Sequence, residues 1–262
     1  MKFRVKKIGN KIANRFGYKL VSKDSGWFRD WAVELTAVER DFIKYIRKGQ
    51  SVRLSMVSDQ RLVATLKSCR YVVENDIAGD FVECGVWRGG NSILAKKVFE
   101  YLGSDKKVFM FDTFTGMTEP SERDTHLVTN QKATQLYEER RKDTHTDWVF
   151  SPISDVRSYC EEAGIDMDGV IFVQGDVLET LDDPNNIPDA ISVLRLDTDW
   201  YASTKKELEV LYPRIPNSGV LLIDDYGTWG GSRQAVDEYF SAQQRKPLLS
   251  VSDYAGRIAI KI

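Results

Sequence analysis

The chain of 262 residues contains few of the residues that build covalent or zinc-stabilised frameworks, with only three cysteines and two histidines. Cys69, Cys84 and Cys160 are odd in number and widely spaced, so we expect neither a disulfide framework nor a zinc site. No stretch approaches the roughly 20 apolar residues that cross a bilayer, and the basic amino end is not followed by the apolar block of a secretory signal. These absences favour a globular protein of the reducing cytoplasm.

The charges are almost balanced in number but not in position. There are 37 Lys and Arg residues against 39 Asp and Glu, a formal net charge of -2, and eight of the basic residues precede the first acidic residue, Asp24. Subtracting these eight leaves 29 basic against 39 acidic residues, so the remaining chain carries -10. A nucleic-acid binder would need a surface dominated by Lys and Arg, which this distribution excludes. An enzyme with an acidic functional site fits this charge distribution better.

Apolar residues in the basic amino-terminal stretch fall near helical spacing: Val5, Ile8, Ile12, Phe16 and Leu20. Such a pattern allows either a helix at a membrane surface or a solvated helix that packs on its own protein. Two glycines in the stretch weaken an isolated helix. We therefore expect the second arrangement and no membrane contact.

From about residue 81 onward, short apolar runs alternate with amphipathic segments, which is typical of a parallel sheet covered by helices. The predicted strands are 81–86, 108–114, 170–174, 191–196, 220–223, 248–252 and 257–262. Because residues 253–256 are too few for a helical crossover, the last two strands must form a hairpin, with one strand antiparallel to the rest. Five parallel strands and a carboxy-terminal hairpin predict the α/β, Rossmann-like seven-stranded sheet of class I methyltransferases.

Helical patterns set the predicted domain organisation. They follow the strands at 92–101, 154–163, 204–212 and 234–244. The region 1–76 reads as a helical cap, and 77–262 as the methyltransferase domain. Within that domain, residues 118–150 form a polar insertion that holds both histidines, and an insertion of this length is more often a functional lid than a linker.

Residues that suit a nucleoside follow the first three predicted strands. Glycines at the strand-to-helix turn 83–92 let the backbone approach a ligand, while the bulky Trp87 disfavours a dinucleotide pyrophosphate there. Asp112 ends the second strand, where a carboxylate can accept hydrogen bonds from ribose hydroxyls. The segment Gln174, Gly175 and Asp176 follows the third strand, where an adenine edge can be read. Together these strand ends predict an adenosine pocket.

The fourth and fifth strands end in acidic pairs: Asp197 and Asp199, then Asp224 and Asp225. Parallel strands place these four carboxylates at one edge of the sheet, where they would repel one another unless a hard cation such as Mg²⁺ binds. The alternative is that they cap helices or pair with Arg195 and Arg233.

An adenosine pocket beside a carboxylate-bound metal suits transfer of a methyl group from a sulfonium to a substrate hydroxyl. The metal would lower the pKa of the hydroxyl and a carboxylate would take its proton. We predict that Asp197, Asp224 and Asp225 are metal ligands and that Asp199 is the base. The alternative, in which Asp197 and Asp199 exchange these roles, remains open.

Four segments resemble the macrocin O-methyltransferase (TylF/MycF) family of S-adenosylmethionine-dependent sugar O-methyltransferases. They are the segments 81–90, 111–117, 196–204 and 223–239, and the resemblance extends from about Met56 to Ile262. It implies Mg²⁺-dependent methylation of a sugar hydroxyl, a helical lid and a homo-oligomer. One departure is Thr228, where many relatives are expected to carry His.

The resemblance also implies roles for individual residues. It assigns Asp197, Asp224 and Asp225 to the metal and Asp199 to proton removal. It assigns to the cofactor Met56, Glu83, Gly85, Ser92, Asp112, Gln174, Gly175 and Asp176. The aromatic residues Trp27, Phe28 and Trp31 match no family motif and are expected to pack a cap rather than a substrate.

Other interpretations remain open at this stage. A metal could chelate a catechol as well as a sugar diol, and a non-catalytic nucleotide-binding module would need no metal at all. His126 and His145 are competing general bases, but their place in the polar insertion favours a lid or surface role.

Overall fold

The computed structural model describes residues 34–262, and residues 37–262 form one compact unit. The predictions for the basic amino-terminal stretch and for Trp27, Phe28 and Trp31 lie outside the described residues. Within the described part, no helix is both long and apolar enough to cross a membrane. The predicted division of the chain at residue 76 stays a prediction.

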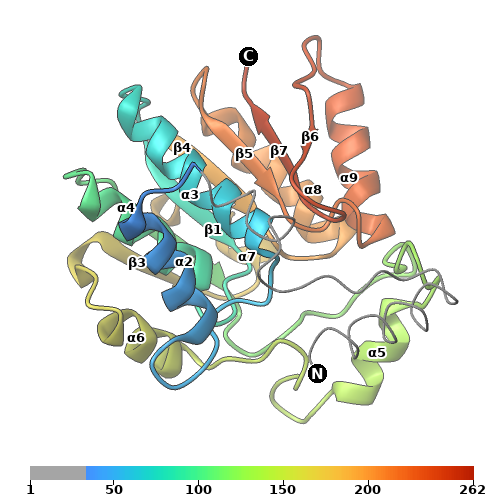
Figure 1. Ribbon diagram of the computed structural model, residues 1–262. Helices are drawn as coiled ribbons and strands as arrows, with labels where there is room; N and C mark the ends of the chain where they lie inside the picture. The colour runs from blue at the N-terminus through green and yellow to red at the C-terminus, as the bar shows by residue number, and fades with distance from the viewer. Residues whose placement is uncertain (1–33) are drawn as a thin grey trace, which may run out of the picture. The chain divides into compact units, whose positions relative to one another are not determined.

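Seven strands form one mixed sheet in the order β3-β2-β1-β4-β5-β7-β6 (Figure 1). They are β1 (Asp80–Cys84), β2 (Val108–Asp112), β3 (Val170–Gln174), β4 (Ile191–Leu196), β5 (Val220–Ile223), β6 (Ser250–Val251) and β7 (Arg257–Ile260). The first five strands are parallel, while β7 is antiparallel to both β5 and β6. The predicted class I methyltransferase sheet is confirmed.

Four strands, β1, β2, β6 and β7, are shorter than the sequence pattern predicted, and two of them show the local features involved. β1 stops at Cys84 because Gly85 has φ +83° and turns the chain out of the sheet. β6 keeps only two residues at the edge, and both are exposed. A short edge strand offers little backbone for pairing with another chain.

Helices cover both faces of the sheet, and Figure 1 shows α2, α3 and α4 on one side with α8 and α9 on the other. The α-helices are α2 (Ala37–Lys48), α3 (Asp59–Glu74), α4 (Gly90–Tyr101), α5 (Ala133–Arg140), α6 (Ile153–Glu162), α7 (Val177–Thr180), α8 (Tyr201–Val210) and α9 (Gly230–Ser241). Short 3₁₀ helices are η3 (Met167–Gly169), η4 (Pro184–Asn186) and η5 (Tyr212–Arg214). Helices were expected at α4, α6, α8 and α9.

Alternation along the strands sends successive side chains to opposite faces. Val82 and Cys84 of β1 enter the core on the side of α8 and α9, together with Leu208 and Val236 from those helices. Glu83, which lies between them, points to the other face. All three cysteines of the chain are free and buried.

The polar insertion is fastened to the rest of the fold by main-chain hydrogen bonds. The Leu127 amide donates to the Thr228 carbonyl at 2.8 Å, and the Gly230 amide donates to the Thr125 carbonyl at 2.9 Å. The buried Asp124 carboxylate accepts from the Tyr201 amide, at the start of α8, at 2.8 Å. The insertion therefore follows a defined course beside the amino ends of α8 and α9.

Three tryptophans hold the insertion against these helices. Trp148 of the insertion makes edge contacts with Trp200 and Trp229, whose ring centroids lie 5.5 and 6.0 Å away. The Trp200 indole also donates to the Thr118 carbonyl at 3.0 Å. This tryptophan cluster forms a rigid apolar base for the insertion.

One buried carboxyl near the end of β4 has no ion-pair partner among the residues that the structure describes. Glu207 of α8 is fully buried, accepts from the Thr198 hydroxyl at 2.8 Å, and leaves its Oε2 atom without a hydrogen-bond partner. Burial raises the pKa of Glu207 to about 8. The folded protein therefore prefers this carboxyl protonated.

We predict that Glu207→Gln raises the free energy of unfolding above that of the wild type at pH 8.5, and that this gain is much smaller at pH 5. A carboxyl with a raised folded pKa contributes stability below its unfolded pKa of 4.5, and that stability is lost as the pH rises through about 8. Glutamine keeps the acceptor for Thr198 but cannot ionise. The expected gain at pH 8.5 is on the order of a few kcal/mol in the free energy of unfolding, measured by urea titration.

Glu209→Gln, at an exposed position on the same helix, is the matched control. Equal pH dependence in the wild type and the Glu207→Gln variant would contradict the prediction.

Candidate active site

A pocket of about 340 Å³ opens at the carboxyl edge of the parallel strands. Its lining includes, among others, residues that follow the ends of all five parallel strands: Gly85, Asp112, Gly175, Asp176, Asp197, Asp199, Asp224 and Asp225. Met56, Thr228 and the insertion residues Met117 and Trp148 also line it. The pocket thus lies at the sheet edge where open α/β folds bind ligands.

The turn after β1 depends on a glycine. Gly85 has φ +83°, and a Cβ there would overlap the carbonyl oxygen of Asp197. The backbones that follow β1 and β4 therefore touch at the base of the pocket. This contact joins the part of the pocket that is predicted to bind the nucleoside to the part that holds the acidic residues.

Asp112 organises the same turn through its carboxylate. Oδ2 accepts from the Val86 amide at 2.7 Å and from the Trp87 amide at 3.0 Å, and Oδ1 accepts from the Phe114 amide at 2.7 Å. Burial raises the pKa of Asp112, while these amides lower it. Asp112 lines the pocket and also fixes the loop around that position, and its contact with a ribose stays a prediction.

The segment after β3 divides between pocket and surface. Gly175 and Asp176 line the pocket, whereas Gln174 is exposed and is not part of the lining. One oxygen of Asp176 accepts from the Leu178 amide at 2.9 Å and caps α7. Of the three predicted adenine contacts, the structure brings two to the pocket.

Glu83 and Ser92 lie behind the pocket rather than in its lining. Both are buried, and the Ser92 hydroxyl donates to Glu83 Oε2. The other oxygen of Glu83 accepts from Arg195 Nη1 at 2.7 Å, because the two residues are register partners on β1 and β4. Burial raises the pKa of Glu83 to about 7, with Arg195 and Ser92 opposing the shift.

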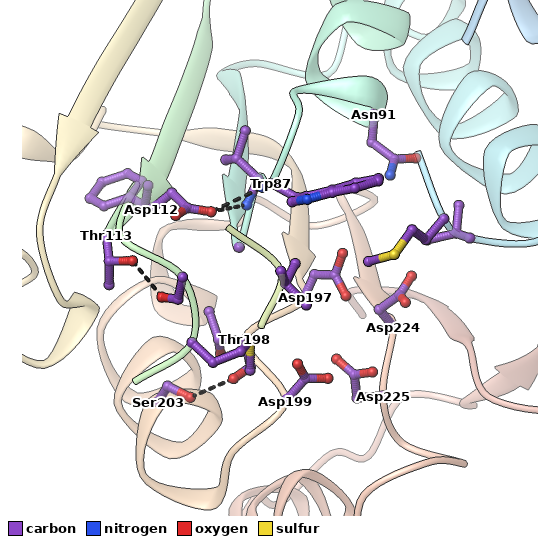
Figure 2. Close-up of a pocket in the computed structure, with 18 of the residues that line it drawn as sticks. Trp87, Asn91, Asp112, Thr113, Asp197, Thr198, Asp199, Ser203, Asp224 and Asp225 are labelled. Atoms are coloured by element: carbon purple, nitrogen blue, oxygen red, sulfur yellow. Dashed lines mark hydrogen bonds between the residues drawn. The ribbon is translucent and has the colours of Figure 1, made fainter. Parts of the chain in front are cut away.

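The acidic residues converge around Arg195, whose side chain is only 2% exposed. Its Nη1 atom donates to Asp197 Oδ2 at 2.6 Å, and its Nη2 atom donates to Asp224 Oδ1. Asp197, Asp224 and Asp225 each offer an oxygen, and these oxygens all lie within 4.8 Å of one another. Figure 2 shows these carboxylates together with Asp199 on one side of the pocket.

Two features of the cluster indicate uncompensated negative charge. Burial, together with the charges of Asp197 and Asp224, raises the pKa of Asp199 to about 7. Burial also raises the pKa of Asp225, whose Oδ2 atom is buried without a hydrogen-bond partner. The alternative sequence interpretation also holds in part, since Arg195 does pair with Asp197 and Asp224, whereas Arg233 donates to the Tyr226 carbonyl instead.

Sequence reasoning missed Arg61 of α3, which lines the pocket. Its Nη1 atom donates to Asp224 Oδ2, and its Nε atom donates to Asp253 Oδ2 at 3.0 Å. Both oxygens of Asp224 are therefore held by guanidinium groups. No sequence pattern signals this pair, because the partners are 163 residues apart.

The two histidines stand outside the pocket lining. His126 Nδ1 accepts from the amides of Val128 and Thr129, each at 3.2 Å. His145 Nε2 lies 3.2 Å from Asp147 Oδ1 in an exposed pair. Their rings serve the local structure of the insertion.

The sheet order and the pocket at its carboxyl edge define a class I methyltransferase fold. The chain belongs to the macrocin-O-methyltransferase (TylF) family, whose model matches residues 26–257. It is an S-adenosylmethionine-dependent O-methyltransferase.

Relatives with named activities support this membership. The 8-demethyl-8-(2,3-dimethoxy-alpha-L-rhamnosyl)-tetracenomycin-C 4'-O-methyltransferase of Streptomyces olivaceus is 35% identical over 194 residues, which cover 74% of this chain and 70% of that protein. Mycinamicin III 3''-O-methyltransferase of Micromonospora griseorubida is 30% identical, covering 72% and 71%. The solved O-methyltransferase NovP superposes with a TM-score of 0.69 at 25% identity, covering 91% of this chain and 99% of that one.

We predict that Gly85→Ala destabilises the protein by more than about 3 kcal/mol, since backbone strain and overlap with Asp197 add together. Gly164→Ala is the matched control, because Gly164 also has positive φ, +67°, but its Cβ would meet open space. That control is expected to cost about 1 kcal/mol. Urea unfolding of both variants measures the difference, and equal losses would contradict the predicted overlap.

Proposed function

We propose that this enzyme methylates a hydroxyl of a sugar, carried on a glycan or a glycosylated small molecule, with Mg²⁺ as its metal. Two relatives support the sugar acceptor, since their names describe methylation at the 4' and 3'' positions of glycosylated compounds. In this proposal Asp197, Asp224 and Asp225 hold the cation, and Asp199 is the general base.

The observation that carries the metal proposal is the buried Asp225 Oδ2 atom without a hydrogen-bond partner. Within residues 34–262, the four carboxylates that follow β4 and β5, together with the buried Glu83, have two guanidinium groups as ion-pair partners, those of Arg61 and Arg195. Such an excess of buried negative charge is costly unless a cation joins it. An oxygen-only ligand set of three carboxylates suits a hard divalent ion.

A bound divalent ion would supply Lewis-acid activation, which lowers the pKa of a coordinated hydroxyl. The chain's own residues then complete the reaction. Asp199 takes the hydroxyl proton while the oxygen attacks the methyl carbon of the donor, and the sulfonium leaves as a neutral thioether. Arg195 and Arg61 keep the Asp224 carboxylate fixed, so that the acceptor meets the methyl group in line.

For the methyl donor, we propose that Asp112, Gly175 and Asp176 contact the nucleoside, with Gly85 at the turn and Met56 at the mouth. Their common position in the pocket lining supports these roles. Glu83 and Ser92 would serve the same site indirectly, by holding Arg195.

We also propose a homo-oligomer in the cytoplasm, on the basis of the family resemblance. Light scattering of the purified protein measures the subunit number.

We predict that EDTA abolishes methyl transfer and that added Mg²⁺ restores it. Asp225→Asn should lower the rate at least 100-fold, because one ligand charge is lost, while S-adenosylhomocysteine binding measured by calorimetry stays within a few-fold of the wild type. Asp189→Asn, at an exposed position outside the pocket, is the control. Full activity in EDTA would refute the metal proposal.

We predict that Asp199→Asn lowers kcat about 10²- to 10⁴-fold with cofactor binding intact, as expected for loss of a general base. The His126→Ala/His145→Ala double variant should retain turnover. A double variant that binds cofactor but no longer turns over would assign the base to the insertion instead.

A panel of rhamnosides, sugar nucleotides and catechols with radiolabelled methyl donor tests the acceptor class. Transfer to catechols alone would overturn the sugar assignment.

A further inference from the structure

Trp87 has an unusual backbone conformation at the edge of the pocket. It lines the cavity and has φ +49°, in the left-handed region that non-glycine residues rarely adopt. The turn is held there by the two amide hydrogen bonds to Asp112 Oδ2. A bulky residue kept in a strained conformation at a ligand site indicates a function for its side chain.

One face of the indole is covered from outside the pocket. The Arg88 guanidinium lies 4.5 Å from the ring centroid, and its Nη1 atom donates to the Arg53 carbonyl at 3.1 Å. Trp87 lines the pocket, whereas Arg88 is not part of the lining. Figure 2 shows a face of the indole turned toward Asp197 and Asp224.

The indole lies between the two ends of the site. In Figure 2 it extends from the Asp112 side toward Asn91, with a face toward Asp197 and Asp224. A donor whose ribose is held at Asp112 and whose methyl group points to the acidic cluster must place its sulfonium between these positions. The face of Trp87 borders that space.

We propose that Trp87 recognises the positive charge of the methyl donor by a cation–π contact with the sulfonium. The quadrupole of an indole attracts a cation over its face, and the attraction grows when water is excluded. The contact would favour the charged donor over its neutral thioether product and thereby promote product release. This inference rests on the proposed positions of the ribose at Asp112 and the acceptor at the acidic cluster.

The test compares the affinities of S-adenosylmethionine and S-adenosylhomocysteine, measured by calorimetry without acceptor and in the presence of EDTA. Trp87→Leu should reduce the preference for the charged ligand about five- to thirtyfold relative to the wild type. Trp87→Phe, which keeps an aromatic face, should retain most of the preference. Both replacements have a side chain at the same left-handed position, so the backbone strain is matched.

Trp148→Leu is the control, because it removes a pocket tryptophan that belongs to the cluster with Trp200 and Trp229. It should leave the ratio of the two affinities unchanged. If Trp87→Leu weakens both ligands by the same factor, the indole only packs and the proposal is overturned. Failure of the proposed function would appear separately, as absence of acceptor methylation by the unaltered protein.

Discussion

A buried guanidinium is the constraint on which the site depends. Arg195 stands in the central strand β4, almost without solvent contact, and a charge in that position requires carboxylate partners. It finds them on the neighbouring β1 at Glu83, after its own strand at Asp197, and after the neighbouring β5 at Asp224. The pairing therefore fixes how the ends of β1, β4 and β5 stand relative to one another. Removing this cation would leave the buried Glu83 and Asp224 and the partly buried Asp197 without their shared partner.

Contacts between backbones extend this order to the cofactor end. Gly85 touches the Asp197 carbonyl, and Asp112 draws the amides of Val86 and Trp87 toward β2. The turn after β1 and the loop after β4 are consequently parts of one packed unit. Such preorganisation matters for methyl transfer, whose rate depends chiefly on the alignment of donor and acceptor.

The strands and the four acids at their ends could be predicted from the sequence, because apolar runs mark buried strands and parallel strands share one carboxyl edge. The same logic could not separate Glu83, which points behind the sheet, from residues that enter the pocket, since only the register with Arg195 decides this. Arg61 was missed because it is remote in sequence from Asp224. The tryptophan cluster was missed because its members come from three separate segments.

The way in which the insertion is attached has a consequence for evolution. Its bonds from Leu127 to Thr228 and from Gly230 to Thr125 join main-chain atoms, which every residue type other than proline can supply. Side chains of the insertion other than the anchoring Asp124 and Trp148 can thus change without altering its path beside the pocket. Pocket-facing side chains of the insertion, such as Met117, can therefore change the shape of the pocket without disturbing the buried ion pairs of Arg195.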